Sequence, residues 1–162
     1  MELKTFAAYS TSAQTRLYKF LLDKPEACAS TFETIASFKS IHDLLAHMIG
    51  AEESWCARIL GEELPPRYEG RAPESVAAIY ADWRAQRKIT ESILEGAGAA
   101  ELSRSLAVTL RVIDAQLQLT VEQILFQIFN HENFHRAQCS LLLQMQGIDP
   151  PLFDFVVEYM AR

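Results

Sequence analysis

The sequence predicts an all-α protein: a four-helix bundle with a short β-hairpin and a short C-terminal helix. Three observations indicate this fold class. Apolar residues recur every three or four positions through several long segments, which is the period of an amphipathic helix. Only six glycines and six prolines occur in 162 residues, fewer turn signals than a many-stranded β fold needs. The length suits one domain, residues 1–162, that can bury its own hydrophobic core.

Two helices are predicted in the first part of the chain. The first covers residues 2–22, and residues 26–39, rich in Ser and Thr, are expected to form a connector with one short helical turn. Ser40 opens the second helix, because Ser40 and Asp43 form a variant of the capping box in which each side chain satisfies the other's backbone N–H. Gly61 ends this helix.

A third helix is predicted from about Glu74 to Glu95. Its inward-facing residues are expected to be Val76, Ile79, Tyr80, Trp83 and Ile89. The basic residues Arg84, Arg87 and Lys88 on this helix are interpreted as a solvated face, because isolated charges on a helix usually face water.

After the third helix the apolar period changes to that of a strand. Apolar residues alternate with others from Leu106 to Arg111, and Leu117 and Leu119 alternate likewise, which predicts a short hairpin. Thr120 and Gln123 then form a capping box at the start of the longest helix. This helix runs to about Gln146, and a last short helix carries Phe153, Phe155, Val156 and Tyr159.

Charge and composition argue against several classes of protein. The net charge is −6 and no Lys/Arg run occurs, whereas nucleic-acid binders usually present a basic face. The N-terminal segment lacks the apolar stretch of a signal peptide, and no apolar run approaches a membrane span. The three cysteines are far apart and form no CxxC pair. We therefore expect a cytoplasmic protein without nucleic-acid or membrane partners.

Two histidines on the longest predicted helix are candidates for a metal site. His131 and His135 are four residues apart, so both lie on one face, one turn apart. That face is otherwise apolar, and two imidazoles buried there without a metal would need several hydrogen-bond partners. Neutral imidazoles at this spacing can reach one ion at about 2.0–2.1 Å.

His47, on the core edge of the second predicted helix, is the third candidate ligand. A facing helix could present it to His131 and His135. His42 is five residues earlier, about 140° around the helix, so we interpret it as a capping or surface residue. Three imidazoles leave at least one coordination position open, as catalytic metal sites require.

Read literally, the segment from His131 to His135 is also the HExxH string of zinc proteases. In that interpretation Glu132 is the general base and Glu158 supplies a third ligand. The string is short enough to arise by chance on a helix. Such proteases generally align peptide substrates on a sheet edge, and this chain offers only a short hairpin.

Three stretches favour another interpretation. They are SIHDLLAHMIGAE at 40–52 followed by Trp55, NHENFHRAQ at 130–138, and GIDPPLFD at 147–154. Together they resemble the DinB-like (damage-inducible) family of metal-binding four-helix bundles, in the family's order and over the whole chain. Phe134 stands where many members have histidine, and Ala137 where many have glycine.

The resemblance implies a function as well as a fold. It implies that His47, His131 and His135 bind one divalent transition metal, of which zinc or nickel is expected first and iron or manganese are alternatives. It also implies a thiol-dependent transferase acting on a small molecule, with a low-molecular-weight thiol as partner, and a homodimer. A hydrolase that uses a metal-bound water is the other enzymatic interpretation. The competing class is a non-catalytic metal-binding or dimerisation bundle.

Two further residues are candidate catalytic groups. Glu132 is predicted as a base or as a residue that orients an imidazole, with an exposed helix carboxylate as the alternative. Arg136 is predicted to hold an anionic group of the substrate, with an ordinary surface arginine as the alternative. Cys139, one turn beyond His135, is interpreted as a buried core cysteine rather than a ligand.

Overall fold

Long helices form the body of the protein in the computed structural model, which describes residues 2–32, 38–110 and 114–160. They are α1 (Leu3–Leu22), α3 (Ile41–Leu60), α4 (Val76–Gly96) and α6 (Val121–Met145). Shorter elements are α2 (Pro25–Ala29), the 3-10 helix η1 (Tyr68–Gly70), α5 (Ala99–Leu102), β1 (Ser105–Leu110), β2 (Ala115–Thr120) and α7 (Phe155–Met160). The predicted helical bundle with a hairpin and a short C-terminal helix is confirmed.

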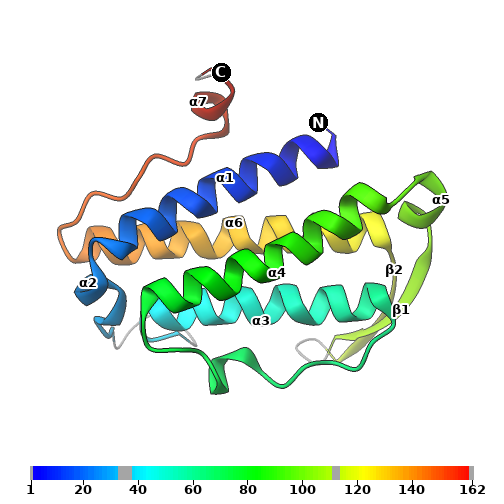
Figure 1. Cartoon of the computed structure of the whole chain (residues 1–162), viewed down its shortest axis with the longest axis horizontal. Coiled ribbons are helices and arrows are strands. Elements are labelled where there is room, and N and C mark those ends of the chain that lie inside the picture. Colours follow the sequence, from blue (N-terminus) through cyan, green and yellow to red (C-terminus); the bar gives the residue numbers. More distant parts are fainter. Residues whose placement is uncertain (1, 33–37, 111–113, 161–162) are drawn as a thin grey trace.

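The long helices pack as a ring in which α1 contacts α4 and α6, and α3 contacts α4 and α6. Figure 1 shows that α1 and α6 run in one direction and that α3 and α4 run in the opposite one. Because α3 and α4 are parallel, the chain between them has to return along the full length of α3. This crossover, residues 61–75, carries η1 and lies along the side of the bundle.

The predicted caps are largely confirmed. The Ser40 side chain accepts from the Asp43 backbone N–H at 3.1 Å, and Gly61 ends α3 in the left-handed conformation at φ 72°. The reciprocal half of the Ser40 box is wrong, because the Asp43 carboxylate accepts from the Lys39 backbone N–H at 3.0 Å instead. The capping box predicted for α6 is complete, with both bonds between Thr120 and Gln123 present.

The hairpin pairs β1 and β2 antiparallel from Ser105 opposite Thr120 to Leu110 opposite Ala115. Arg111, at the end of the predicted first strand, lies outside the described residues, as do residues 33–37 of the predicted connector. The short helical turn expected in that connector is α2, which begins at Pro25.

The prediction for α4 needs two corrections. The helix begins at Val76 with Ser75 as its N-cap, so Glu74 lies before it. Ile89 is 45% exposed, and the inward face contains Gln86, Arg87 and Thr90 in its place. The interpretation of Arg87 as a solvated residue is therefore wrong. The apolar pattern could not show this, because polar residues occupy the middle of the inward face.

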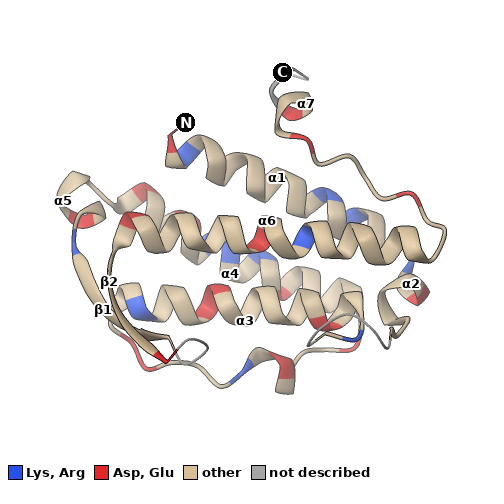
Figure 2. Cartoon of the chain, turned by 180° about the vertical axis from the view of Figure 1, so that it is seen from behind, with Lys and Arg blue, Asp and Glu red and all other residues tan. Residues whose placement is uncertain are grey.

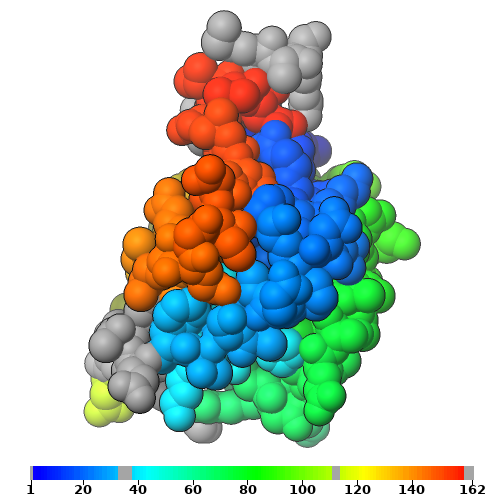
Figure 3. All heavy atoms as spheres, turned by 90° about the vertical axis from the view of Figure 1, so that its left-hand side faces the viewer, coloured from blue at the N-terminus to red at the C-terminus, as the bar shows by residue number. Residues whose placement is uncertain are grey.

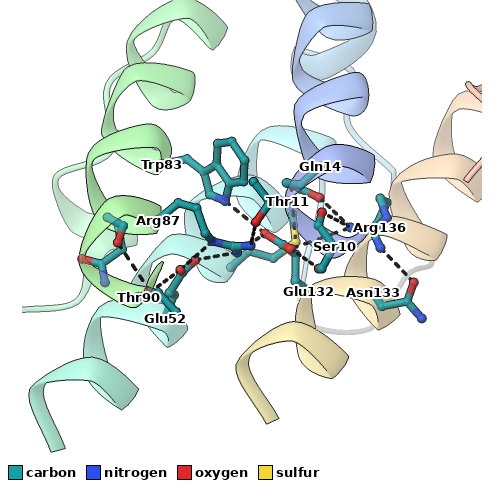
Figure 4. A network of polar contacts seen from close by, with 12 residues as sticks. Ser10, Thr11, Gln14, Glu52, Trp83, Arg87, Thr90, Glu132, Asn133 and Arg136 are labelled. Carbon is teal, nitrogen blue, oxygen red and sulfur yellow. Dashed lines mark hydrogen bonds and ion pairs between the residues drawn. The ribbon is translucent and has the colours of Figure 1, made fainter. Parts of the chain in front are cut away.

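The interior of the bundle consists of two apolar layers with a polar layer between them. One apolar layer joins the C-terminal half of α1 to the N-terminal halves of α3 and α4, and contains the buried residues Leu17, Leu45 and Trp83. The other lies toward the hairpin and contains Ile59, Leu94 and Phe129. Apart from His135, the buried polar residues of α1, α3, α4 and α6 lie between these layers, and Figure 4 shows how they converge.

Arg87 is the centre of the polar layer. Its guanidinium donates twice to Glu52 on α3, at 2.9 and 3.0 Å, and once to Glu132 on α6, at 2.7 Å. Thr90 donates to Glu52 as well. Burial raises the pKa of Glu52 and Arg87 opposes this effect. Burial alone would lower the pKa of Arg87, but Glu132 and Glu52 raise it. The three charged groups are thus stable in the interior only together.

The C-terminal segment packs against α1. The Glu158 carboxylate accepts from Ser12 at 2.8 Å and pairs with Arg16, and the Tyr9 hydroxyl donates to the Phe153 carbonyl. In Figure 3 this segment (red) rises beyond the rest of the molecule beside α1 (blue).

Basic and acidic residues are interspersed along the helices, as Figure 2 shows for the face seen from behind. No helix in the described part of the chain is long and apolar enough to cross a lipid bilayer.

The polar layer predicts a large loss of stability when Arg87 is replaced. Arg87→Met should lower the free energy of unfolding by roughly 3–5 kcal/mol, because two buried carboxylates then lose their shared partner. Urea unfolding followed by circular dichroism measures this. Arg84→Met, at an exposed position on the same helix, is the control and should change stability by less than about 0.5 kcal/mol. Equal effects of the two substitutions would contradict this account of the interior.

Candidate metal centre

Three histidines from two helices meet at the surface between α3 and α6. One ring nitrogen from each of His47, His131 and His135 lies within 4.8 Å of the others. His47 comes from α3, and the other two come from successive turns of α6, as their spacing predicts. Among the residues that the structure describes, no other group of three or more His, Cys, Asp or Glu has this potential to hold an ion.

Hydrogen bonds fix the tautomer of two of these rings. The Nδ1 of His135 lies 2.6 Å from the Gln138 Oε1, and the Nδ1 of His47 lies 3.1 Å from the Glu69 Oε1. Because these oxygens accept, Nδ1 of each ring donates, and Nε2 is the ring atom left to face a metal ion. This is the arrangement in which outer-shell partners orient histidine ligands of metals.

The electrostatics keep the α6 histidines neutral. Burial, followed by the neighbouring His135 and His47, lowers the pKa of His131 to about 3. Burial also lowers the pKa of His135, although its bond with Gln138 opposes this shift. A neutral imidazole is the form that coordinates a metal, so neither ring has to lose a positive charge before it binds one at neutral pH.

The contact between the two α6 rings fits a shared cation. The Nε2 atoms of His131 and His135 are 3.0 Å apart. Since Nδ1 of His135 donates to Gln138, Nε2 of His135 accepts a hydrogen bond from Nε2–H of His131, and an ion between the rings would take the place of this bond. With His47 beside both rings, at 5.1 and 4.9 Å between ring centroids, the donor set is three imidazole nitrogens. Such a set suits a divalent transition-metal ion better than calcium or magnesium.

Aromatic rings flank the histidines. Phe38 packs against His47 and His135, at 4.6 and 5.5 Å between ring centroids. The ring of Phe134 lies 5.2 Å from that of His135, between ring centroids, and Phe134 is 59% exposed. Apolar surroundings of this kind limit the access of water to a polar group.

A cavity of about 780 Å³ lies on one side of the histidine group, and His47 is part of its wall. It is bounded by α3, by the crossover between α3 and α4, and by β1. His131 and His135 do not line it.

Gly50 allows the crossover to approach α3 closely enough for Glu69 to reach His47. A Cβ at position 50 would lie 3.1 Å from the Cβ of Tyr68, tighter than ordinary van der Waals contact. Tyr68 is buried and its hydroxyl donates to Asp82 at 2.6 Å, so η1 has little freedom to move outward. A side chain at position 50 would therefore disturb the Glu69–His47 contact.

Glu132 lies in the polar layer rather than among the histidines. It is 3% exposed, so its interpretation as an exposed carboxylate is wrong. Its oxygens accept from Ser10 at 2.6 Å, from Trp83 at 3.0 Å and from Arg87 at 2.7 Å. These donors come from α1 and α4 (Figure 4), and the group of potential metal ligands does not include Glu132.

Arg136 is buried as well, at 1% exposure, so its interpretation as a surface arginine is wrong. Its guanidinium donates to Asn133 at 2.9 Å and to Gln14 at 3.3 Å, and lies 3.7 Å from the Glu132 carboxylate. It thus holds α6 against α1 (Figure 4). The catalytic roles predicted for Glu132 and Arg136 remain predictions.

The other candidates lie apart from the histidine group. His42 Nε2 is 2.9 Å from the Pro73 carbonyl oxygen, and Glu158 bonds with residues of α1. Cys139 is fully buried in the apolar layer, where burial raises the pKa of its thiol.

Three residues around the histidines were not predicted from the sequence: Gln138, Glu69 and Phe38. Gln138 has a recognisable signal, because it lies three residues after His135, within reach on the same helix face. Glu69 lies 22 residues from His47 in a loop, and no periodicity connects the two. Phe38 likewise precedes α3 without a regular spacing to either helix.

Comparisons with known proteins identify a family model and several solved structures of similar fold. The sequence matches the model of the DinB family over residues 1–161. The crystal structure of a DinB-like protein from Bacillus cereus superposes with a TM-score of 0.67, covering 90% of this chain and 94% of the other. The two are 17% identical, so this likeness shows the fold alone. No curated protein sequence matches.

The contact between Glu69 and His47 predicts an effect on metal affinity. Glu69→Ala should weaken the binding of added Zn²⁺ by roughly 10–100-fold, because His47 loses the carboxylate that orients it. Competition with a chromophoric chelator measures the affinity. Glu63→Ala, an exposed change elsewhere in the crossover, is the control and should leave the affinity unchanged. Equal affinities of the Glu69 variant and the unmodified protein would show that this contact does not support the site.

Proposed function

This chain belongs to the DinB family, and from that premise we propose that it binds one divalent transition-metal ion on His47, His131 and His135. The observation that carries the proposal is the convergence of three imidazole nitrogens within 4.8 Å. In two of the three rings Nδ1 bonds with an oxygen of the chain, which leaves Nε2 to face an ion. Zinc and nickel are the expected ions, because both accept three imidazole nitrogens readily; iron and manganese are alternatives.

We further propose that the ion serves catalysis on a small-molecule substrate in the cytoplasm. Three protein ligands leave a coordination position open, and a divalent ion there lowers the pKa of a bound water or thiol toward neutrality. Such a site serves two kinds of enzyme: a thiol-dependent transferase, or a hydrolase that uses a metal-bound water. The cavity beside His47 offers room for a substrate within the proposed single domain.

The chain's own residues have distinct roles in this proposal. Glu69 and Gln138 orient His47 and His135, and Phe38 limits access of water to both rings. Glu132 and Arg136 act through the position of α6, because their polar atoms bond with α1 and α4. The zinc-protease reading is disfavoured for the same reason, since it needs the Glu132 carboxylate at the metal.

A non-catalytic metal-binding or dimerisation bundle is the second candidate. The observation that favours it is a row of exposed apolar side chains on α6. Phe126, Phe134, Leu141 and Met145 are each about half exposed and recur on the outer face of the helix. A homodimer would cover such a face. A fourth coordination position closed by a protein ligand would favour this candidate, and one open to solvent would favour an enzyme.

The ligand set predicts the metal content of variants. The purified, untagged protein should carry about one transition-metal ion per chain, and His131→Ala combined with His135→Ala should abolish it. Elemental analysis measures both. His42→Ala is the matched control, because His42 lies on α3 outside the histidine group and should leave the metal content unchanged. A protein that takes up neither zinc nor nickel when these are added would refute the proposal.

The open position predicts that an exogenous thiol can reach the ion. In protein loaded with Co²⁺ as a spectroscopic substitute, 2-mercaptoethanol should produce a sulfur-to-cobalt charge-transfer band, because thiolate is a good ligand for this ion. Absorption spectroscopy measures the band. The same titration of Co²⁺ in buffer alone is the control. An unchanged spectrum of the loaded protein would indicate a closed site and favour the non-catalytic candidate.

A further inference from the structure

One face of α3 forms the floor of the cavity beside His47. The residues of this face that line the cavity are His47, Gly50, Ala51, Ser54 and Arg58; all but the adjacent pair at 50 and 51 follow one another by three or four residues, as one side of a helix requires. His47 stands at one end and Arg58 at the other. The residues between them are small, so the floor leaves room for a ligand lying along the helix.

The distance between the two ends follows from the helix geometry. Arg58 folds back along α3, because its guanidinium donates to the Ser54 carbonyl at 2.7 Å. The positive charge therefore lies near the level of Ser54, seven residues from His47. At 1.5 Å per residue this separation is about 10 Å along the helix. A ligand that touches both ends has to be elongated.

The walls between these ends are mostly apolar. Leu64 and Pro65 of the crossover, with Val108 and Leu110 of β1, line the cavity. The middle of a ligand therefore meets aliphatic side chains and offers few hydrogen-bond partners.

The charged side chains that line the cavity favour a ligand with a single negative charge. Arg58 and Arg67 line the cavity, and neither forms an ion pair with an Asp or Glu of the described chain. Other arginines such as Arg71 and Arg104 do have carboxylate partners. The one acidic residue of the lining, Glu69, is occupied by His47. A half-buried guanidinium without a counterion attracts an anion, and burial lowers the pKa of Arg58 as expected for such a charge.

We infer that this cavity binds an elongated small molecule whose remote end carries a carboxylate held by Arg58, with Arg67 assisting, while its reactive end lies beside His47. The inference rests on the proposed function for the identity of that reactive end, which is a metal-binding group such as a thiol. A carboxylate matches the one net positive charge that two arginines and one glutamate leave among the side chains of the lining.

The test compares two probes that differ only at the remote end. Protein loaded with Co²⁺ is titrated with 8-mercaptooctanoate and with 8-mercapto-1-octanol, and the sulfur-to-cobalt band gives each Kd. The carboxylate probe should bind about tenfold more tightly, since a charge-assisted hydrogen bond in a partly buried site is worth that much. Equal affinities of the two probes would overturn the inference.

Variants assign the preference to the arginines. Arg58→Gln should abolish the preference for the carboxylate probe, Arg67→Gln should reduce it, and Arg58→Lys should retain part of it. Arg84→Gln, an exposed change on α4, is the control and should leave it unchanged. Each variant should bind as much cobalt as the unmodified protein. A preference that persists in Arg58→Gln would overturn the inference.

Failure of the proposed function would give a different experimental result from failure of this inference. A protein that takes up no cobalt refutes the metal site, and the carboxylate subsite is then tested with octanoate and metal-free protein by isothermal titration calorimetry. Binding that is lost in Arg58→Gln and kept in Arg84→Gln supports the subsite. Absence of octanoate binding in that experiment refutes it.

Discussion

The structure depends on one buried guanidinium. Arg87 joins Glu52 of α3 to Glu132 of α6 from its position on α4, and Ser10 of α1 completes the contacts of Glu132. Charges this deep are stable only when every partner is in place. The four long helices therefore share a geometric constraint that apolar packing alone does not impose, since apolar layers tolerate small rotations and shifts of a helix.

This constraint bears directly on the histidine group. Glu132 directly follows His131 on α6, and Arg136 directly follows His135, so each pair is separated by about 100° around the helix axis. Bonds that direct Glu132 and Arg136 toward α1 and α4 therefore turn His131 and His135 toward α3, where His47 lies. The orientation of α6 about its own axis therefore sets both the polar layer and the candidate metal centre.

The sequence predicted the helices well because their signals are local. The capping box of Thr120, the glycine at position 61 and the four-residue spacing of His131 and His135 are each contained within one helix. Burial of Arg87 and Glu52 was missed, since each is buried only through a partner on another helix. The cavity was missed for the same reason: the crossover and β1 close it, and their approach to α3 depends on tertiary contacts such as that of Gly50 with Tyr68.

The central claim is that three imidazoles coordinate one ion and leave a position open. X-ray absorption at the metal edge of the zinc- or nickel-loaded protein tests it most directly. The account predicts three nitrogen ligands with the multiple scattering of imidazole, at about 2.0–2.1 Å for zinc, and one further oxygen or nitrogen from solvent. A protein sulfur at about 2.3 Å, or a shell without imidazole scattering, would contradict it.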